Sequence, residues 1–307
     1  MGLFVDTYKK KMIIRYDKDE AIPYFSAKDF SGLDYKKETF KNTRDIEIAY
    51  FTYSFKDYKK DKVILFLPGM GPGHTAYLAE INSFCRKGYK VITLDYTGCG
   101  ESKGETLISM NEPTRDVVDL LNHLKLNEEI IIVGHSVGAY TALNVLHLRE
   151  EIKKGVCISG FLNLKDELMN TMITSIVVSP IMKYEKSVEP DYFDIDNVQY
   201  LSNTEDKILF IHSKDDNRVK FVPVMHALEK LKNPNLTLMQ VNHKKHNPTY
   251  TEKAVEYLDY CFKGYEKLLK KNASLEERKK FMKDKSIYKM TEQDKDMIQA
   301  IIDYIEK

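Results

Sequence analysis

The 307-residue chain has almost no net charge, because 47 lysines and arginines nearly balance 46 aspartates and glutamates and leave a formal charge of +1. A surface that binds nucleic acid needs a clear excess of positive charge. The chain also lacks any apolar run near the roughly 20 residues that a membrane-spanning helix requires. We therefore expect no nucleic-acid partner and no membrane span.

Cysteines are few, and the spacing of the four is not that of a metal site. Free thiols of this kind are typical of a reducing compartment. No signal peptide is predicted, because Lys9–Lys11 soon follow the short apolar start. Gly2 is not a predicted myristoylation site, since Asp6 stands where that motif has serine or threonine. These features predict a soluble cytoplasmic protein. The cysteines are Cys85, Cys99, Cys157 and Cys261.

Short apolar runs are plentiful, and six of them alternate with helix-length amphipathic stretches. Runs rich in valine and isoleucine are typical of strands buried on both faces of a mostly parallel sheet. Arg44–Phe55 alternates with a period of two, which predicts an antiparallel strand at the edge of the sheet. The whole pattern predicts an open α/β sheet with helices on both faces. The six runs are Val63–Leu67, Lys90–Leu94, Ile130–Val133, Gly155–Ser159, Lys207–His212 and Leu236–Val241. The predicted helices between them are Thr75–Arg86, Pro113–Leu124, Ser136–Arg149 and Val222–Leu231.

Two regions depart from this alternation. Residues 161–202 form a strongly apolar insertion between the fourth and fifth runs. Residues 272–307 contain a capping box at Ser274–Glu277 and a similar helix start at Thr291, which predict two helices packed on the core or on a partner. We expect one domain over residues 1–271 that carries the insertion, followed by a helical extension over 272–307. If these helices pack on a partner, that partner could be a second copy of the chain, which would make a homodimer. Residues before about 40 have no clear assignment.

The most informative motif is Gly134-His135-Ser136-Val137-Gly138, which follows the run Ile130–Val133 and leads into an amphipathic stretch. A strand that enters a helix through Gly-x-Ser-x-Gly is the sequence form of a nucleophile elbow. The tight turn would hold Ser136 in a strained backbone conformation with its hydroxyl above the sheet. A β-carbon at either glycine would collide with neighbouring backbone. The motif predicts a nucleophilic serine, and the plainer alternative is a serine in an ordinary loop.

A serine nucleophile needs a histidine base and a carboxylate that orients it. In a parallel sheet both come from loops at the carboxyl ends of strands. Asp216, in the loop after the fifth apolar run, is our choice for the acid, with Asp215 as its rival. His246, in the loop after the sixth run, is our choice for the base, with His243 as its rival.

Backbone amides must also stabilise the oxyanion that forms on the substrate carbonyl. The amide of Val137 directly follows the nucleophile and lies at the positive end of a predicted helix. The second donor is expected in the Gly/Pro-rich loop Pro68–Gly73, which leaves the first buried run. Met70 is the predicted donor in that loop.

The order Ser136, Asp216, His246 resembles that of the α/β-hydrolase superfamily, and the resemblance covers about residues 44–271. Asp95–Gly104 is similar to the Asp-x-Arg-Gly-x-Gly-x-Ser-x-Gly loop of its monoglyceride-lipase-like and serine-aminopeptidase-like branch. The chain departs from the family pattern in several loop residues, which bear on loop geometry and substrate choice. They include Pro68 in place of histidine, Thr97 in place of arginine, Ser213 in place of glycine and Lys220 in place of proline.

The resemblance implies that residues 161–202 form a helical cap over an acyl pocket, and that no metal or cofactor is needed. The leading hypothesis is a serine hydrolase of carboxylic esters with a small or medium acyl chain. Thioesterases, peptidases and acyltransferases use the same groups, and a peptidase would present acidic side chains near the site. Two further alternatives are a ligand-binding relative without catalysis and an assembly module built on the tail. The candidate acidic side chains in the cap are Glu167, Glu185, Glu189 and Asp191.

Overall fold

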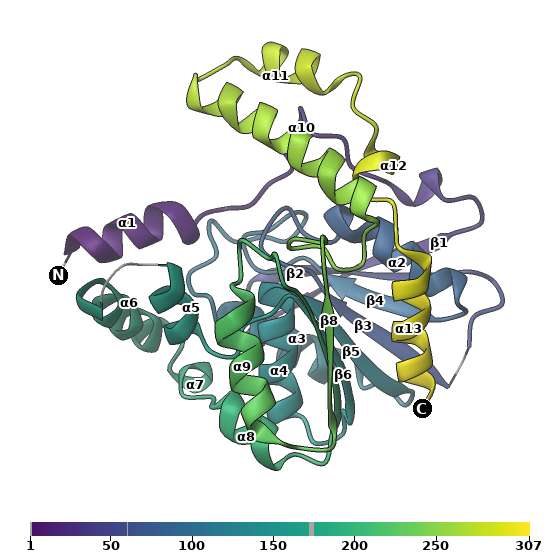
Figure 1. The fold of residues 1–307 in the computed structure, drawn as a ribbon, viewed down its shortest axis with the longest axis vertical. Helices are drawn as coiled ribbons and strands as arrows, with labels where there is room; N and C mark the ends of the chain where they lie inside the picture. The colour runs from purple at the N-terminus through teal and green to yellow at the C-terminus, as the bar shows by residue number, and fades with distance from the viewer. Residues whose placement is uncertain (1, 60, 172–174) are drawn as a thin grey trace.

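The computed structural model describes residues 2–59, 61–171 and 175–307 (Figure 1). Within these residues, eight strands form one sheet in the order β1-β2-β4-β3-β5-β6-β7-β8. Strand β2 pairs antiparallel with both of its neighbours, and the pairs from β4 to β8 are parallel. The strands are β1 (Asp34–Lys41), β2 (Glu47–Ser54), β3 (Lys62–Leu67), β4 (Lys90–Leu94), β5 (Glu129–His135), β6 (Lys154–Ile158), β7 (Lys207–Ser213) and β8 (Leu236–Val241).

The six predicted apolar runs are strands β3 to β8, so the predicted open α/β sheet is confirmed. Two details of the prediction were wrong. The alternating stretch Arg44–Phe55 contains β2, which is not an edge strand, because β1 pairs along its outer side. Strand β8 is the opposite edge and is only partly buried, because one of its sides has no strand beside it.

Helices cover both faces of the sheet (Figure 1). Along β3, Val63 and Leu65 join the buried cluster on the face of α3, α4 and α9, whereas Ile64 and Phe66 join the cluster on the face of α2 and α13. Successive side chains of a strand point to opposite faces, so a short strand can serve both layers. The helices are α2 (Leu78–Arg86), α3 (Glu112–Leu124), α4 (Val137–Leu148), α9 (Phe221–Leu231) and α13 (Lys295–Glu306).

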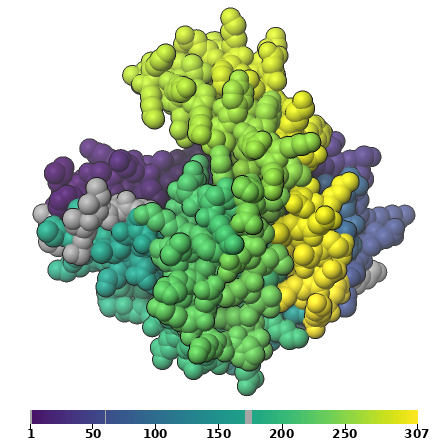
Figure 2. All heavy atoms as spheres, viewed as in Figure 1, coloured from purple at the N-terminus to yellow at the C-terminus, as the bar shows by residue number. Residues whose placement is uncertain are grey.

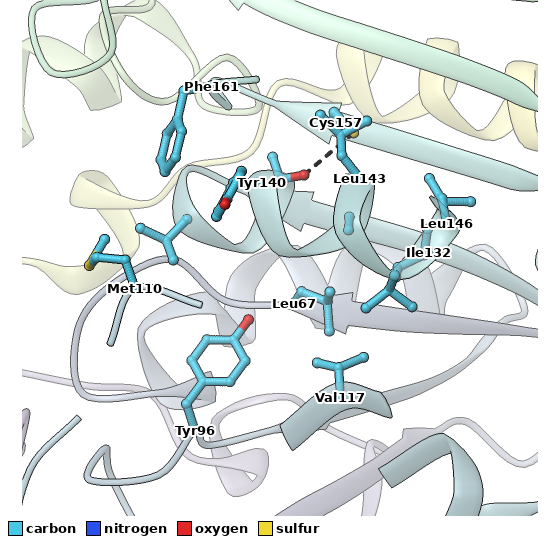
Figure 3. Close-up of a cluster of buried hydrophobic side chains, with 14 of the residues drawn as sticks. Leu67, Tyr96, Met110, Val117, Ile132, Tyr140, Leu143, Leu146, Cys157 and Phe161 are labelled. Carbon is cyan, nitrogen blue, oxygen red and sulfur yellow. Dashed lines mark hydrogen bonds between the residues drawn. The ribbon is translucent and has the colours of Figure 1, made fainter. Parts of the chain in front are cut away.

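Helix α4 is almost wholly apolar and lies in the centre of the larger cluster (Figure 3). Leu143 and Leu146 are buried in this cluster together with Ile132 of β5. The Tyr140 ring stacks on the Phe161 ring with centroids 4.6 Å apart. This packing fixes the helix that directly follows the predicted elbow, so the turn has a rigid support on both sides.

The apolar insertion is helical, as the family resemblance implied. Its residues 172–174 lie outside the described part of the chain. The insertion contributes Leu168, Val178 and Ile181 to the larger buried cluster, so its apolar residues serve as core as well as cover. Its helices are α5 (Leu164–Thr171), α6 (Ser175–Val188), α7 (Pro190–Phe193) and α8 (Asn197–Asn203), the last of which ends one residue beyond the predicted bound.

The N-terminal residues, which had no assignment from the sequence, form helix α1 (Gly2–Met12) and strand β1. Helix α1 lies beside α6 (Figure 1). The buried Tyr8 hydroxyl donates a hydrogen bond of 2.6 Å to Glu185 of α6. The start of the chain is therefore held against the insertion.

The C-terminal residues 272–307 contain three helices rather than the predicted two. Helix α13 buries Ile298, Ile301 and Ile305 against the sheet, and the Lys154 ammonium donates a 2.7 Å hydrogen bond to the carbonyl of Ile305. Helices α10 and α11 form a lobe that stands out from the body (Figure 2). None of the helices in the described residues is long and apolar enough to cross a bilayer. The remaining helices are α10 (Glu252–Lys270), α11 (Leu275–Met282) and α12 (Ile287–Met290).

Candidate active site

The chain turns sharply at Ser136, between β5 and α4. Ser136 has φ 57° and ψ −120°, a conformation that non-glycine residues rarely adopt. A β-carbon on Gly134 would lie 2.1 Å from the carbonyl oxygen of Gly138, and one on Gly138 would lie 2.1 Å from that of Leu67. Both positions therefore require glycine. The half-buried Ser136 stands at the turn that the motif predicts.

Asp216 and His246 meet although they lie on different loops. The His246 Nδ1 is 2.8 Å from Asp216 Oδ2, and Asp216 Oδ1 accepts hydrogen bonds from the amides of Arg218 (2.9 Å) and Val219 (3.1 Å). Burial alone would raise the pKa of Asp216, but hydrogen bonds from His212, His246 and the loop amides hold that pKa well below its usual range. The carboxylate is therefore ionised and directed at the His246 ring.

The two rival residues lie elsewhere. The carboxylate of Asp215 accepts hydrogen bonds from the Ser213 hydroxyl (2.6 Å) and the Lys245 amide (3.2 Å), so it ties the acid loop to the histidine loop. His243 is exposed. The structure thus brings together the first-choice acid and the first-choice base.

A second histidine contacts the same carboxylate. His212 Nε2 lies 2.9 Å from the carbonyl of Val219 and 3.3 Å from Asp216 Oδ2, and its side chain is fully buried. Because a carbonyl can only accept, Nε2 carries the proton. From the sequence, His212 was assigned no role beyond the end of the run Lys207–His212. Its place at the carboxyl end of β7, four residues before Asp216, was the available signal.

The loop after β3 lies against the nucleophile. A β-carbon on Gly69 would stand 3.2 Å from the Ser136 β-carbon and 2.5 Å from the Tyr77 hydroxyl oxygen, so only glycine fits there. The Gly69 amide donates to that hydroxyl at 3.0 Å. Gly69 already has this acceptor, and Met70 remains the predicted donor in this loop. Val137 is the first residue of α4, where an amide has no acceptor within the helix.

His135, inside the elbow, links this loop to the candidate base. Its Nε2 is 2.7 Å from the carbonyl oxygen of His246, and its Nδ1 is 2.9 Å from the Tyr77 hydroxyl. The carbonyl requires a proton on Nε2, so the Tyr77 hydroxyl donates to Nδ1 while it accepts from Gly69. Burial first, and then the charge of His246, lowers the pKa of His135 to about 3. His135 is therefore neutral, and sequence reasoning did not assign it this contact.

Known proteins share this architecture. The family model for serine aminopeptidase, S33, matches residues 58–189. An esterase from Pyrococcus furiosus superposes with a TM-score of 0.59 at 20% identity, over 81% of this chain and 96% of that one. A bromoperoxidase from Bacillus anthracis superposes with a TM-score of 0.51 at 18% identity, over 69% of this chain and 93% of that one. The chain has the α/β-hydrolase fold, which the family model supports over the residues it matches.

Two curated relatives match parts of the chain. Proline iminopeptidase of Saccharolobus solfataricus is 25% identical over 192 residues, which are 61% of this chain and 60% of that protein. A chloroplastic protein of Arabidopsis thaliana that carries a methylesterase name is 29% identical over 100 residues, which are 32% of this chain and 29% of that protein. The matches thus span less than two thirds of either relative.

Most of the acidic side chains in the cap hold the cap in place. The buried Glu185 accepts from the Ser109 hydroxyl at 2.5 Å as well as from Tyr8, and the buried Glu189 lies 2.6 Å from an Arg115 nitrogen. Asp191 is exposed and lies 3.6 Å from Arg115.

Glu167 of α5 is different, because it interacts electrostatically with the acid of the site. Burial, and then the negative charge of Asp216, raises the pKa of Glu167 to about 7. The charge of Glu167 therefore couples to the loop of Asp216.

Proposed function

We propose that this α/β-hydrolase cleaves carboxylic esters through an acyl-enzyme intermediate. Ser136 Oγ attacks the ester carbonyl while His246 Nε2 takes its proton. Asp216 holds the proton on His246 Nδ1, which leaves Nε2 as the basic nitrogen and stabilises the imidazolium that forms. The observation that carries this proposal is the 2.8 Å contact between Asp216 and His246. It occurs in a chain whose Ser136 has a strained φ of 57° at the turn between β5 and α4.

The remaining steps follow from the same groups. The amides of Met70 and Val137 would donate to the oxyanion of each tetrahedral intermediate. His246 returns its proton to the alcohol oxygen as the ester C–O bond breaks. Water then attacks the acyl-enzyme, giving one proton to His246, and the carboxylic acid leaves as Ser136 regains its proton. In this proposal the helical insertion walls a pocket for a small or medium acyl chain.

The test of the nucleophile is the variant Ser136→Ala. Hydrolysis of p-nitrophenyl butyrate should fall by at least about a thousandfold, because removal of a triad serine removes the covalent route. Ser202→Ala, at an exposed position in the cap, is the matched control and should hydrolyse the ester like the parent. The assignment fails if Ser136→Ala keeps the parental rate.

A chain-length series tests the substrate class. We expect kcat/KM to be higher for p-nitrophenyl butyrate or octanoate than for the palmitate ester, because the proposed pocket takes short and medium chains. A maximum at palmitate would reject the proposed acyl-chain length, and the proposed role of Ser136 as nucleophile would still stand.

A serine aminopeptidase is the second candidate, supported by the family model over residues 58–189 and by Glu167. An ionised Glu167 could pair with a substrate amine. Because its pKa is about 7, cleavage of an aminoacyl arylamide should then rise as the pH increases through 7. Glu167→Gln should abolish that cleavage and spare butyrate hydrolysis. Clear ester turnover with no arylamide cleavage by the parent would exclude the peptidase.

A further inference from the structure

A cavity of about 580 Å³ lies apart from the catalytic loops, on the side of the sheet that α2 and α13 cover. Three segments that are distant in sequence line it: the N-terminal segment at Phe25 and Phe30, helix α2 from Ala79 to Arg86, and the C-terminal residues from Tyr288 to Ile298. Ser136, Asp216 and His246 are not among the lining residues of the described chain. The volume lies in the range of small-molecule sites.

One wall of the cavity is aromatic. The Phe25 ring lies 4.8 Å from the Phe30 ring and 4.8 Å from the Tyr288 ring, centroid to centroid. Phe25 is buried, whereas Tyr288 remains 57% exposed at the edge of this wall. Rings arranged in this way offer both faces and edges to an apolar ligand body.

Two side-chain amides with unused acceptors also line the cavity. Asn82 is only 8% exposed, and within the described chain its Oδ1 has no hydrogen-bond partner. The buried Oε1 of Gln293 likewise has none there, although its Nε2 donates to the Thr291 carbonyl at 2.9 Å. A buried amide oxygen without a donor is unfavourable. A bound N–H or O–H group would satisfy one of these oxygens.

The charged side chains that line the cavity are mostly cationic. Arg86, Lys87 and Lys295 are exposed, and Glu292 is the acidic one. Lys87 already donates to Gln299 at 2.6 Å, and Glu292 accepts from Thr251 at 2.9 Å. The Arg86 guanidinium lies over the Phe55 ring, 5.2 Å from its centroid, a contact that leaves its charge unpaired with an anion. Arg86 and Lys295 supply positive charge at the cavity, which favours an anionic group.

We propose that this cavity is a second binding site, for a small amphipathic acid. The apolar body lies along Phe25, Phe30 and Tyr288, an N–H or O–H group of the ligand donates to Asn82, and the anionic group faces Arg86 and Lys295. This site is independent of the ester chemistry, and it assigns a role to the two ends of the chain, which together build it with α2.

The probe for this site is 1-anilinonaphthalene-8-sulfonate, which combines an aromatic body, one N–H and one anionic group. The probe is titrated with the protein, and its fluorescence is measured. We expect saturable binding with one site per chain. Tyr288→Ala should raise Kd about fivefold through the lost ring contact, and Arg86→Glu should raise it about tenfold through charge reversal.

Matched controls separate this site from other apolar surfaces. Tyr260→Ala removes a tyrosine that is 62% exposed on α10, and Lys280→Glu reverses an exposed charge on α11, and both should bind like the parent. Ser83→Trp fills the cavity from α2 and should abolish saturable binding, with circular dichroism to show that the fold is intact. Equal Kd values in the parent, Tyr288→Ala and Arg86→Glu would overturn the proposal, as would equal losses in the two controls.

Discussion

Three histidines surround the candidate acid and nucleophile, and each makes a different contact. His246 pairs with Asp216, His212 contacts the same carboxylate, and His135 donates to the His246 carbonyl. The sequence allowed Ser136, Asp216 and His246 to be chosen, because each lies in a loop at the carboxyl end of a strand. The contacts of His135 could not be predicted, since they join residues that are 58 and 111 positions apart.

We predict that the Tyr77 hydroxyl positions the loop Pro68–Gly73, which contains the predicted oxyanion donor Met70. Tyr77→Phe removes the acceptor of the Gly69 amide and the donor to His135. The loop beside Ser136 should then be less well positioned in the transition state, so kcat should fall about tenfold or more with little change in KM. Steady-state kinetics on p-nitrophenyl butyrate measure this. Tyr260→Phe is the control, and an unchanged kcat in Tyr77→Phe would contradict the prediction.

His135 is predicted to make stability depend on pH. Its pKa is about 3 in the folded chain and about 6.5 when unfolded, so between these values the unfolded state binds the extra proton. The free energy of unfolding is therefore highest above pH 6.5 and falls by up to about 1.4 kcal/mol per pH unit as the pH decreases towards 3.

Urea unfolding at pH 7 and pH 5 checks this pH effect. From pH 7 to pH 5, the free energy of unfolding should fall by about 2 kcal/mol less in His135→Gln than in the parent, because the variant lacks the titrating group. His226→Gln, at an exposed position on α9, should behave like the parent. The same pH dependence in His135→Gln and the parent would refute the assignment.

At the scale of elements, the buried strands and β2 were predictable, and β1 was not. Strands β3 and β5 are continuous apolar runs because both of their faces are covered. Strand β1 is mostly exposed and charged, and it forms only because β2 pairs with it along its length. Charge on an edge strand opposes pairing with other chains. The sequence of β1 therefore has no apolar run from which a strand could be predicted.

Glu189 is predicted to hold the cap to the body of the molecule. Its fully buried carboxylate lies 2.6 Å from Arg115 and 2.9 Å from Arg44. Glu189→Gln removes the nearest carboxylate of these two partly buried cations, which in the described chain keep only Glu112 (3.4 Å) and Asp191 (3.6 Å), so the free energy of unfolding should fall by about 3 kcal/mol. Asp191→Asn, at an exposed position, should change it by less than about 0.5 kcal/mol. Urea unfolding measures both, and a loss below 1 kcal/mol for Glu189→Gln would contradict this role.

At the scale of the whole molecule, the two ends of the chain complete the body. Helix α13 buries an isoleucine-rich face against the sheet, so residues 272–307 include part of the core. The capping signals predicted helices there but not their position, because α13 contacts α2 and shares a buried cluster with residues of β3 and β5, all far back in the sequence.

A substitution at Ile301 tests whether α13 is part of the buried core. Its side chain is fully buried, so Ile301→Ala should lower the free energy of unfolding by about 2–5 kcal/mol, through lost burial and the cavity left behind. Ile176→Ala, at a position that is 73% exposed in the cap, should have little effect. Equal stability of the two variants in urea would show that α13 is dispensable to the core.

The central claim is that Ser136 is a nucleophile activated by His246 and Asp216. Its most direct measurement is labelling of the full-length protein with a fluorophosphonate, followed by mass spectrometry of the peptides. We expect one adduct per chain, on Ser136, with none in Ser136→Ala and much slower labelling in His246→Ala. An unlabelled Ser136 in the folded parent, or an adduct on another residue, would contradict it.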